Sequence, residues 1–308
     1  MKKILMIVAA VAGLFAATSC QKDGSAISGE EVKVNLTVAL PDAFQTRAIA
    51  QAENVDIVYY EIWNSDWTTQ LYPVDNTALA SAVVAGKQAS IDLVLVVDQT
   101  YNFIFWAQKE DCGAYTVTDL KQVAVDYSVI AAAGNQDKFD AFYAVEPIEV
   151  TGPITEKTVT LKRPFAQLNL GASKMSSAFG DITIGTTAVT VDGLATVFDT
   201  VNGVGTTAAA APVTFSATDL AADDALVAGG KSYAWLTMDY VCMIGNKSNV
   251  DVTAAIQVSG IGMVNHFIPS VPVQKNYRTN IVGDLFTSNA KLDIVVDPAF
   301  DGDDPSKE

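Results

Sequence analysis

The sequence predicts an all-β protein that consists of two β-sandwich domains in series with only a few short helices. Three observations lead to this fold class. Runs of alternating apolar and polar residues, which have the period of a half-buried strand, recur between turn residues along the chain. Helical periodicity is nowhere convincing beyond two turns. The 308 residues suffice for two domains of ordinary size, each with its own core.

Residues 1–20 have the pattern of an export signal. A basic start is followed by an apolar run from Ile4 to Ala17, which is too short for a membrane span, and the pattern ends at Cys20. A cysteine directly after small residues at this position resembles a bacterial lipoprotein signal, in which Cys20 is lipid-modified and becomes the mature N-terminus. An ordinary signal peptide with an incidental cysteine is the alternative. Residues 21–30 are small and polar, so we expect a flexible tether.

Residues 31–152 are expected to form the N-terminal β-sandwich domain, which begins with a strand. Its alternation places five apolar side chains on one side of the extended chain: Val32, Val34, Leu36, Val38 and Leu40. Arg47 follows this strand and is the only lysine or arginine between Lys33 and Lys87. Of the two other arginines, Arg163 precedes a proline and Arg278 lies in a predicted strand. We therefore expect the bond between Arg47 and Ala48 to be accessible to a protease.

The remainder of this domain is predicted as strands with two short exceptions. The β-rich segments are residues 55–63, 89–97 and 101–107, and the last two are expected to form a hairpin because only three residues separate them. Residues 118–125 begin with a capping residue and are predicted as a short helix. Residues 136–143 are predicted to be irregular or helical.

Residues 153–300 are expected to form the C-terminal β-sandwich domain, with an acidic tail at 301–308. The boundary is placed at Thr151-Gly152-Pro153. The strand pattern slips phase at Arg163-Pro164, where we expect a bulge. Residues 271–277 repeat the pattern of residues 95–101 at a constant offset of 176, with a short strand, a three-residue link and a tyrosine. This echo indicates two related domains, unless it only reflects what β-hairpins share.

The composition argues against an enzyme, a metal protein or a nucleic-acid partner. The formal charge of −16 repels phosphate backbones. The only histidine, His266, alternates with apolar residues of a predicted strand, and no nucleophile elbow is present, so a catalytic triad is not expected. Asp301 to Asp304 could hold calcium only weakly because the spaced ligands of a calcium loop are missing. Cys112 and Cys242 are expected to be buried free thiols, with a disulfide as the alternative. We predict no cofactor.

Three segments resemble the fimbrillin superfamily, the type V pilus subunits of Bacteroidales. Residues 271–283 (VPVQKNYRTNIVG), followed by Leu285-Phe286-Thr287, resemble the strand near the C-terminus of those proteins. Residues 161–169 (LKRPFAQLN) resemble their mid-chain strand, and Thr46-Arg47-Ala48 resembles their maturation site. The likeness runs from the signal to about Phe300. Each segment is moderately specific, and their order strengthens the resemblance.

The resemblance implies two transthyretin-like β-sandwiches and a structural role in a cell-surface pilus. The precursor would be an outer-membrane lipoprotein, and a maturation protease would cut after Arg47 and release the first strand. The vacated groove would then accept a strand from another pilus subunit, which supports adhesion through a head-to-tail polymer. The candidate donor strand contains Leu292, Ile294 and Val296, although the same segment could be the last strand of this chain's own second domain. Stalk, tip and anchor roles all remain open.

A second reading is a permanently lipid-anchored surface protein that binds a glycan or a host protein and does not polymerise. The mature N-terminus distinguishes the two, because the pilus subunit would begin at Ala48 and the anchored protein at Cys20.

Overall fold

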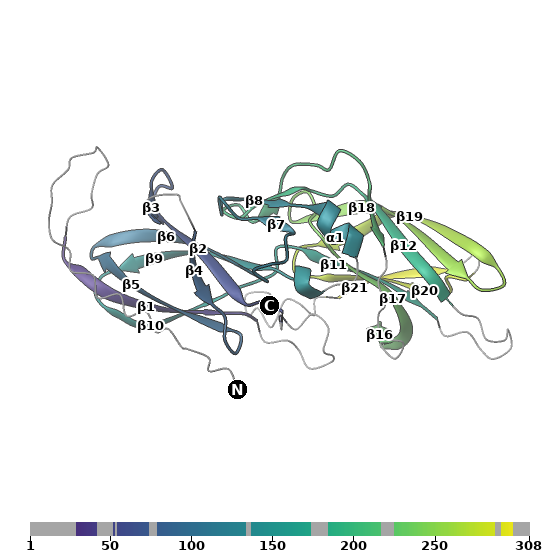
Figure 1. Ribbon diagram of the computed structural model, residues 1–308, viewed down its shortest axis with the longest axis horizontal. Coiled ribbons are helices and arrows are strands. Elements are labelled where there is room, and N and C mark those ends of the chain that lie inside the picture. The colour runs from purple at the N-terminus through teal and green to yellow at the C-terminus, as the bar shows by residue number, and fades with distance from the viewer. Residues whose placement is uncertain are drawn as a thin grey trace, which may run out of the picture.

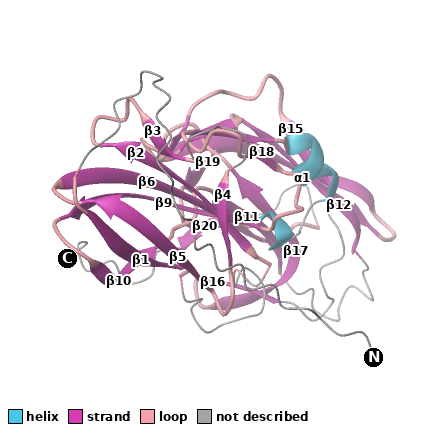
Figure 2. Ribbon diagram, turned by 60° about the vertical axis from the view of Figure 1, so that its left-hand side comes forward, coloured by secondary structure: helices cyan, strands magenta, loops and turns pink. Residues whose placement is uncertain are grey.

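The computed structural model describes residues 29–41, 52, 54–73, 79–133, 137–173, 184–216, 225–286 and 291–297. Strands dominate these residues (Figure 1), and Figure 2 shows the α-helix α1 (Tyr127–Ala133) lying among them. A single turn of 3-10 helix spans Asp137–Phe139. The all-β fold class predicted from the sequence is therefore confirmed.

Two sheets face each other at one end of the molecule (Figure 1). The outer sheet has the order β10 (Ile154–Thr160), β1 (Glu31–Ala39) and β5 (Gln88–Val96). The facing sheet, which we call the middle sheet, has the order β3 (Gln70–Tyr72), β2 (Ile57–Asn64), β6 (Gln99–Gln108) and β9 (Phe142–Val150), and β4 (Ala80–Val83) also pairs with β2. The first core lies between them.

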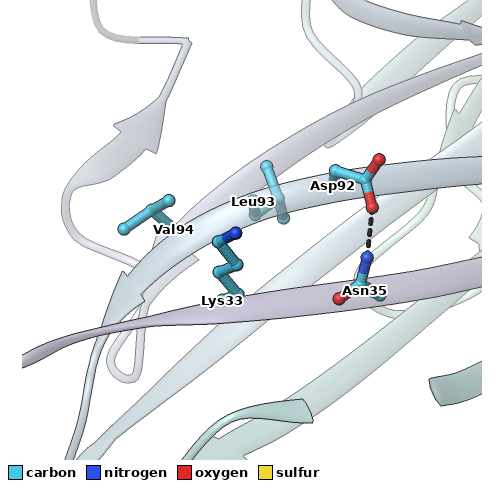
Figure 3. A pocket seen from close by; sticks show the side chains of 5 residues that line it. All are labelled: Lys33, Asn35, Asp92, Leu93 and Val94. Atoms are coloured by element: carbon cyan, nitrogen blue, oxygen red, sulfur yellow. Dashed lines mark hydrogen bonds between the residues drawn. The ribbon is translucent and has the colours of Figure 1, made fainter. Parts of the chain in front are cut away.

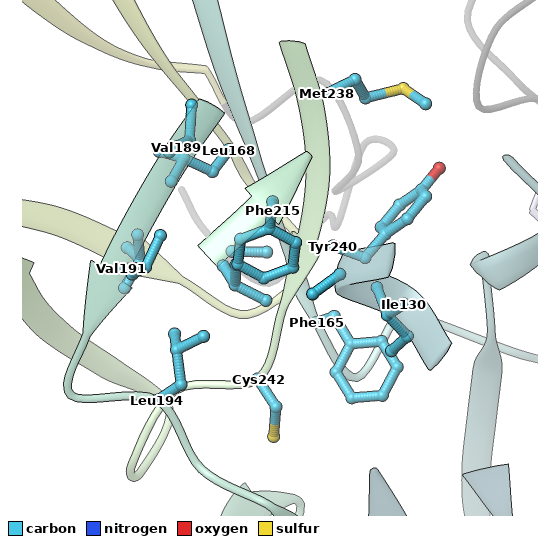
Figure 4. Close-up of a cluster of buried hydrophobic side chains, with 14 of the residues drawn as sticks. Ile130, Phe165, Leu168, Val189, Val191, Leu194, Phe215, Met238, Tyr240 and Cys242 are labelled. Atoms are coloured by element: carbon cyan, nitrogen blue, oxygen red, sulfur yellow. The ribbon is translucent and has the colours of Figure 1, made fainter. Parts of the chain in front are cut away.

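Three further sheets build the other end. One has the order β16 (Ala225–Ala228), β17 (Lys231–Val241), β11 (Ala166–Ala172), β20 (Arg278–Gly283) and β21 (Leu292–Asp297). The second has the order β15 (Val213–Ser216), β12 (Ile184–Asp192), β18 (Lys247–Val258) and β19 (Gly262–Gln274). A small sheet has the order β14 (Val204–Gly205), β13 (Val197–Asp199), β8 (Gln122–Val125) and β7 (Tyr115–Thr116). Phe165, Phe215, Tyr240 and Cys242 lie in the second core, which these sheets enclose (Figure 4).

The two cores meet through the middle sheet. Because side chains alternate along a strand, Phe103 and Phe105 of β6 enter the first core while Ile104 and Trp106 enter the second. On β9, Phe142 faces the first core and Tyr143 the second. Both faces of these strands are thus covered, which explains why almost every residue of β6 is buried.

The predicted hairpin of residues 89–107 is wrong, although both strands exist. β5 pairs with β1, whereas β6 pairs with β2 and β9, so the link between them carries the chain from one sheet to the other. The reason lies in β6, whose side chains are apolar on both faces. It needs a core on each side, and the outer sheet, with Asp92 of β5 exposed on its open face, cannot provide one.

The predicted helix at residues 118–125 is also wrong. Asp119 accepts a hydrogen bond from the backbone N–H of Lys121 at 2.8 Å, but this bond closes a turn. The chain then enters β8, where buried Val123 and Val125 alternate with less buried neighbours. The helix α1 begins just afterwards, behind Asp126, which accepts the N–H of Ser128 at 2.9 Å.

The two cores divide the chain later than residue 152. β10 pairs with β1, and Val159 and Leu161 lie in the first core, whereas Phe165, Ala166 and Leu168 lie in the second. The phase slip at Arg163-Pro164 is therefore a move between sheets and not a bulge. Residues 112–143 also contribute side chains to the second core, so the chain visits it before it completes the first.

Both copies of the repeat at residues 95–101 and 271–277 contain a link between two strands. The first copy links β5 to β6 and the second links β19 to β20, and each link carries the chain from one sheet to another. Asp98 and Asn276, which stand in these links, both have left-handed φ values of 58° and 65°, but they are not equivalent positions, because the offset of 176 places Asp98 opposite Gln274. Cys112 and Cys242 are buried and free, as expected.

Candidate functional site: the first strand and its groove

Strand β1 occupies the centre of the outer sheet. All nine of its residues pair antiparallel with β5, from Glu31 opposite Val96 to Ala39 opposite Gln88. On its other side β1 pairs in parallel with β10, from Val34 to Ala39. Removal of β1 would therefore leave two strands without their partner at the same time.

Backbone hydrogen bonds beyond the strand fix both ends of β1. The N–H of Val97 donates to the carbonyl of Glu30 at 2.9 Å. At the other end, the N–H of Leu40 donates to Lys87 and the N–H of Leu161 donates to Ala39, at 2.9 and 2.8 Å. The strand is thus a fully integrated part of the sheet.

The inner face of β1 closes the first core. Val32, Val34, Leu36, Val38 and Leu40 are all buried, which is the alternation that the sequence predicts. The floor opposite them is the middle sheet, with Val58 and Tyr60 from β2 and Phe103 and Phe105 from β6. The last two rings stack with centroids 5.6 Å apart. Without β1, this floor would open as a long apolar groove.

The outer face of β1 is polar and open to solvent. Glu31, Lys33 and Asn35 are exposed, and the amide of Asn35 donates a hydrogen bond to the carboxylate of Asp92 on β5 (Figure 3). Lys33, Asn35, Asp92, Leu93 and Val94 line a shallow depression of about 360 Å³ at this place. It offers one amine and one carboxylate already bonded to an amide, so it lacks the converging groups of a catalytic site.

The floor of the groove is braced from behind. Glu61 of β2 is buried, and its carboxylate accepts hydrogen bonds from the indole of Trp63 at 2.9 Å and the N–H of Leu120 at 3.0 Å. The ammonium of Lys121 lies 3.1 Å from the centre of the Trp63 ring. Burial raises the pKa of Glu61. These contacts tie the middle sheet to residues next to β8, which pack on the second core.

A buried ion pair lies where the chain passes between the two cores. Arg163 Nη2 is 2.7 Å from Asp140 Oδ2, and Arg163 Nε is 2.8 Å from Asp140 Oδ1. The guanidinium also lies over the ring of Phe142, 4.5 Å from its centre. Burial raises the pKa of Asp140 to about 6, and the positive charge of Arg163 opposes part of that rise. This pair links Asp140, two residues before β9, to Arg163, the residue before Pro164.

Several predicted residues lie outside the described part of the chain: Cys20, Arg47, Ala48 and Asp301 to Asp304. Within the described residues, no helix is long and apolar enough to cross a membrane. The same residues contain no group of histidine, cysteine, aspartate and glutamate side chains that could hold a metal ion.

The candidate donor segment forms β21, an edge strand that pairs with β20 from Leu292 opposite Gly283 to Asp297 opposite Arg278. Leu292 packs against the second core, whereas Ile294 and Val296 are exposed. Val295, of the other parity, packs against a small cluster that contains Leu226 and Val282. The strand thus belongs to this chain's own sheet here, and two of the three predicted donor side chains point away from the core.

His266 has a structural place. It is buried on β19, and its Nε2–H donates to the carbonyl oxygen of Leu285 at 2.9 Å. Through this hydrogen bond from Nε2, His266 anchors the chain after β20.

Two parts of the groove were not foreseen from the sequence. The parallel pairing of β1 with β10 is one, because residues 153–160 are assigned to the second domain there. The Asp140–Arg163 pair is the other. The phase slip at Arg163-Pro164 contains a signal for the ion pair alone, since an arginine between apolar residues at a change of phase indicates a buried charge at a crossing. No local pattern indicates the pairing of β1 with β10.

Comparison with known proteins places the fold. A model of a family described as one of unknown function, DUF6562, matches residues 25–308. Among curated proteins, none matches the chain. Solved structures with a similar fold include a "putative cell adhesion protein" from Bacteroides ovatus ATCC 8483, at 9% identity and a TM-score of 0.55. Another from Bacteroides uniformis ATCC 8492 has 12% identity and a TM-score of 0.54. Each covers 87% of this chain and 98% of its own.

A third similar structure is the tip fimbrial protein Mfa3 from Porphyromonas gingivalis with a C-terminal truncation. It has 11% identity and a TM-score of 0.51, and the match covers 87% of this chain and 99% of that chain. The chain thus shares its fold with proteins described as cell adhesion and tip fimbrial proteins, in agreement with the resemblance to the fimbrillin superfamily.

Proposed function

The chain belongs to the family DUF6562, whose function is unknown, and we propose that it is a non-enzymatic structural subunit of a cell-surface fimbria. The precursor is exported as a lipoprotein through Cys20 to the outer membrane. A protease cuts between Arg47 and Ala48, β1 leaves, and a strand of the next subunit fills its place. The similar folds of a tip fimbrial protein and of proteins described as cell adhesion proteins support a surface role in adhesion.

The position of β1 carries this proposal. It is the first strand that the structure describes, it lies at the centre of a sheet, and its inner face and the adjoining Leu40 bury five apolar side chains. Their burial contributes about 10 kcal/mol at about 2 kcal/mol for each side chain. A groove of that apolar content, with unpaired backbone on both sides, binds an incoming strand strongly. Asn35 and the other outward residues of β1 face solvent and add little to this burial.

The mature N-terminus and the state of the Arg47→Ala variant test the proposal. Material purified from the cell surface should begin at Ala48, and Arg47→Ala should leave membrane-bound monomers that form no filaments. Lys33→Ala is the matched control, because it removes an exposed cation of β1 without touching the cut or the core. Filaments that form unchanged in Arg47→Ala would refute processing. A mature N-terminus at an acylated Cys20 would favour a permanently anchored protein that binds a glycan or a host protein.

A further inference from the structure

Strand β19 is the free edge of the sheet at the end of the molecule opposite β1 (Figure 1). In the described part of the chain its backbone pairs with β18 alone, from Lys247 opposite Gln274 to Val258 opposite Gly262. An edge strand presents a row of backbone donors and acceptors that can pair with another chain. At 13 residues, β19 is the longest strand that the structure describes.

The two halves of β19 differ in how the edge is protected. Pro269 and Pro272 interrupt the donors of the second half, and between them Ser270 has a left-handed φ of 56°. The N–H of Ser270 donates to Asp251 Oδ1 at 2.9 Å, which fixes a bulge at this place. Prolines and bulges are devices that keep edges from pairing. The first half, residues 262–268, has neither, and it contains no lysine, arginine, aspartate or glutamate.

The side chains of this half are bare on the solvent side. Phe267 is 66% exposed and Met263 is 55% exposed, with Asn265 between them. Their neighbours across the ladder on β18 are Thr253, Ala255 and Gln257, which are uncharged. On a chain with a formal charge of −16, this face is a neutral area that a second negative chain can approach.

We propose that residues 262–268 pair antiparallel with the same residues of a second copy of this chain, about a two-fold axis at Asn265. The segment is self-complementary in this register. Met263 lies opposite the partner's Phe267, so a thioether meets an aromatic ring on both sides of the axis. Asn265 lies opposite the partner's Asn265, which allows the two amides to bond each other. The contact is isologous and closes on itself, in contrast to a head-to-tail chain.

A second copy fits this edge better than an unrelated strand does. A charged partner finds no counter-charge here, and the protected half beyond Ile268 limits pairing to a short segment. A partner strand places an apolar side chain opposite both Met263 and Phe267 when it has two exposed apolar residues at the same spacing of four positions, as a second copy does. This pairing uses neither β1 nor Arg47, so it acts independently of the proposed fimbrial assembly and would join two subunits sideways.

The oligomeric state of the Arg47→Ala chain tests the proposal, because strand exchange through β1 cannot occur in it. Sedimentation should show a concentration-dependent dimer. Phe267→Lys, which replaces the apolar partner of Met263 by a charged side chain on both sides of the axis, should weaken the dimer by about tenfold or more. Val83→Lys is the matched control, since Val83 is a 77% exposed valine on β4 at the other end, and it should leave the dimer unchanged. A chain that stays monomeric, or a dimer that tolerates Phe267→Lys, overturns the proposal.

Cysteine cross-linking tests the register. Residues opposite each other in an antiparallel ladder have Cα atoms about 5 Å apart, within reach of a disulfide. Asn265→Cys should therefore give a covalent dimer under mild oxidation. In Met263→Cys the two thiols are four residues apart along the strands, about 13 Å, and should not join. Cys112 and Cys242 are buried and do not interfere, and Cys20 is replaced by serine in both variants. Equal cross-linking in both variants, or none in Asn265→Cys, contradicts the register.

Discussion

Arg163 has a structural role that was not foreseen from the sequence, namely a buried ion pair with Asp140. The proline after it explains why it is a poor protease site, but the structure adds that its guanidinium is buried against Asp140. A buried charge is tolerated only when it is paired, and removal of one partner leaves the other uncompensated. The pair thus holds the chain in place where it passes from one core to the other, because separating Asp140 from Arg163 would leave a buried charge unpaired.

We expect Arg163→Met to destabilise the protein by about 3 to 5 kcal/mol at pH 7, as measured by urea unfolding. The loss should shrink toward pH 5. Burial already raises the pKa of Asp140 to about 6, and without Arg163 it rises further, so the folded state takes up a proton that the unfolded state does not. The free energy of unfolding of the variant therefore rises as the pH falls toward the ordinary pKa of an aspartate, because protonation of Asp140 removes the buried charge.

Lys109→Met provides the control for this residue. Lys109 Nζ lies 3.1 Å from Asp111 in an exposed ion pair, and such pairs contribute little to stability because water and salt screen them. A similar loss in both variants, or a loss in Arg163→Met that does not change with pH, would show that the Asp140 charge is not the cause.

The sequence predicts the orientation and partners of a strand well when one of its faces is buried, and poorly when both of its faces are buried. The alternation of β1 is visible in the sequence because its outer face is wet, and the structure buries the five predicted side chains. Strand β6 is apolar on both faces, so its period indicates neither its sheet nor its partner. The register of β10 with β1 joins residues more than 100 positions apart, and no local signal specifies that pairing.

Alternate residues of β21 face opposite sides of its sheet, so substitutions on the two sides can separate an effect on folding from an effect on assembly. Val295 packs against Leu226 and Val282, so Val295→Asp should cost about 2 kcal/mol or more of stability by burying a carboxylate without a partner. Ile294 is exposed, and Ile294→Asp should leave stability within about 0.5 kcal/mol. Thermal unfolding of the two variants gives the comparison.

The same two variants bear on the donor role. If β21 inserts into the groove of another subunit with Ile294 and Val296 inward, Ile294→Asp should abolish filaments while the monomer remains folded. Filaments of normal length from Ile294→Asp would contradict a donor strand of that parity.

At the scale of the whole molecule, the shared middle sheet explains how a subunit could lose a central strand and stay folded. The middle sheet has the first core on one face and the second core on the other. Loss of β1 opens only the first core. Trp106 and Tyr143 stay buried on the opposite face, where Trp106 lies edge-on to Phe165 with centroids 6.1 Å apart. The floor of the groove is thus held by contacts that do not involve the outer sheet.

Hydrogen exchange can measure this division of stability. In a chain cut after Arg47 and stripped of β1, the amides of β5 and β10 should exchange faster by about two orders of magnitude or more, because both strands lose their partner. The amides of β18, which lie in the second half, should keep their protection, and those of β6 should lose only part of it because Ile104 and Trp106 remain packed. A cut chain that retains β1 is the control and should match the intact protein. Loss of protection throughout β18 would mean that the two cores unfold together, and a subunit without β1 could then not wait in a folded state for the strand that replaces it.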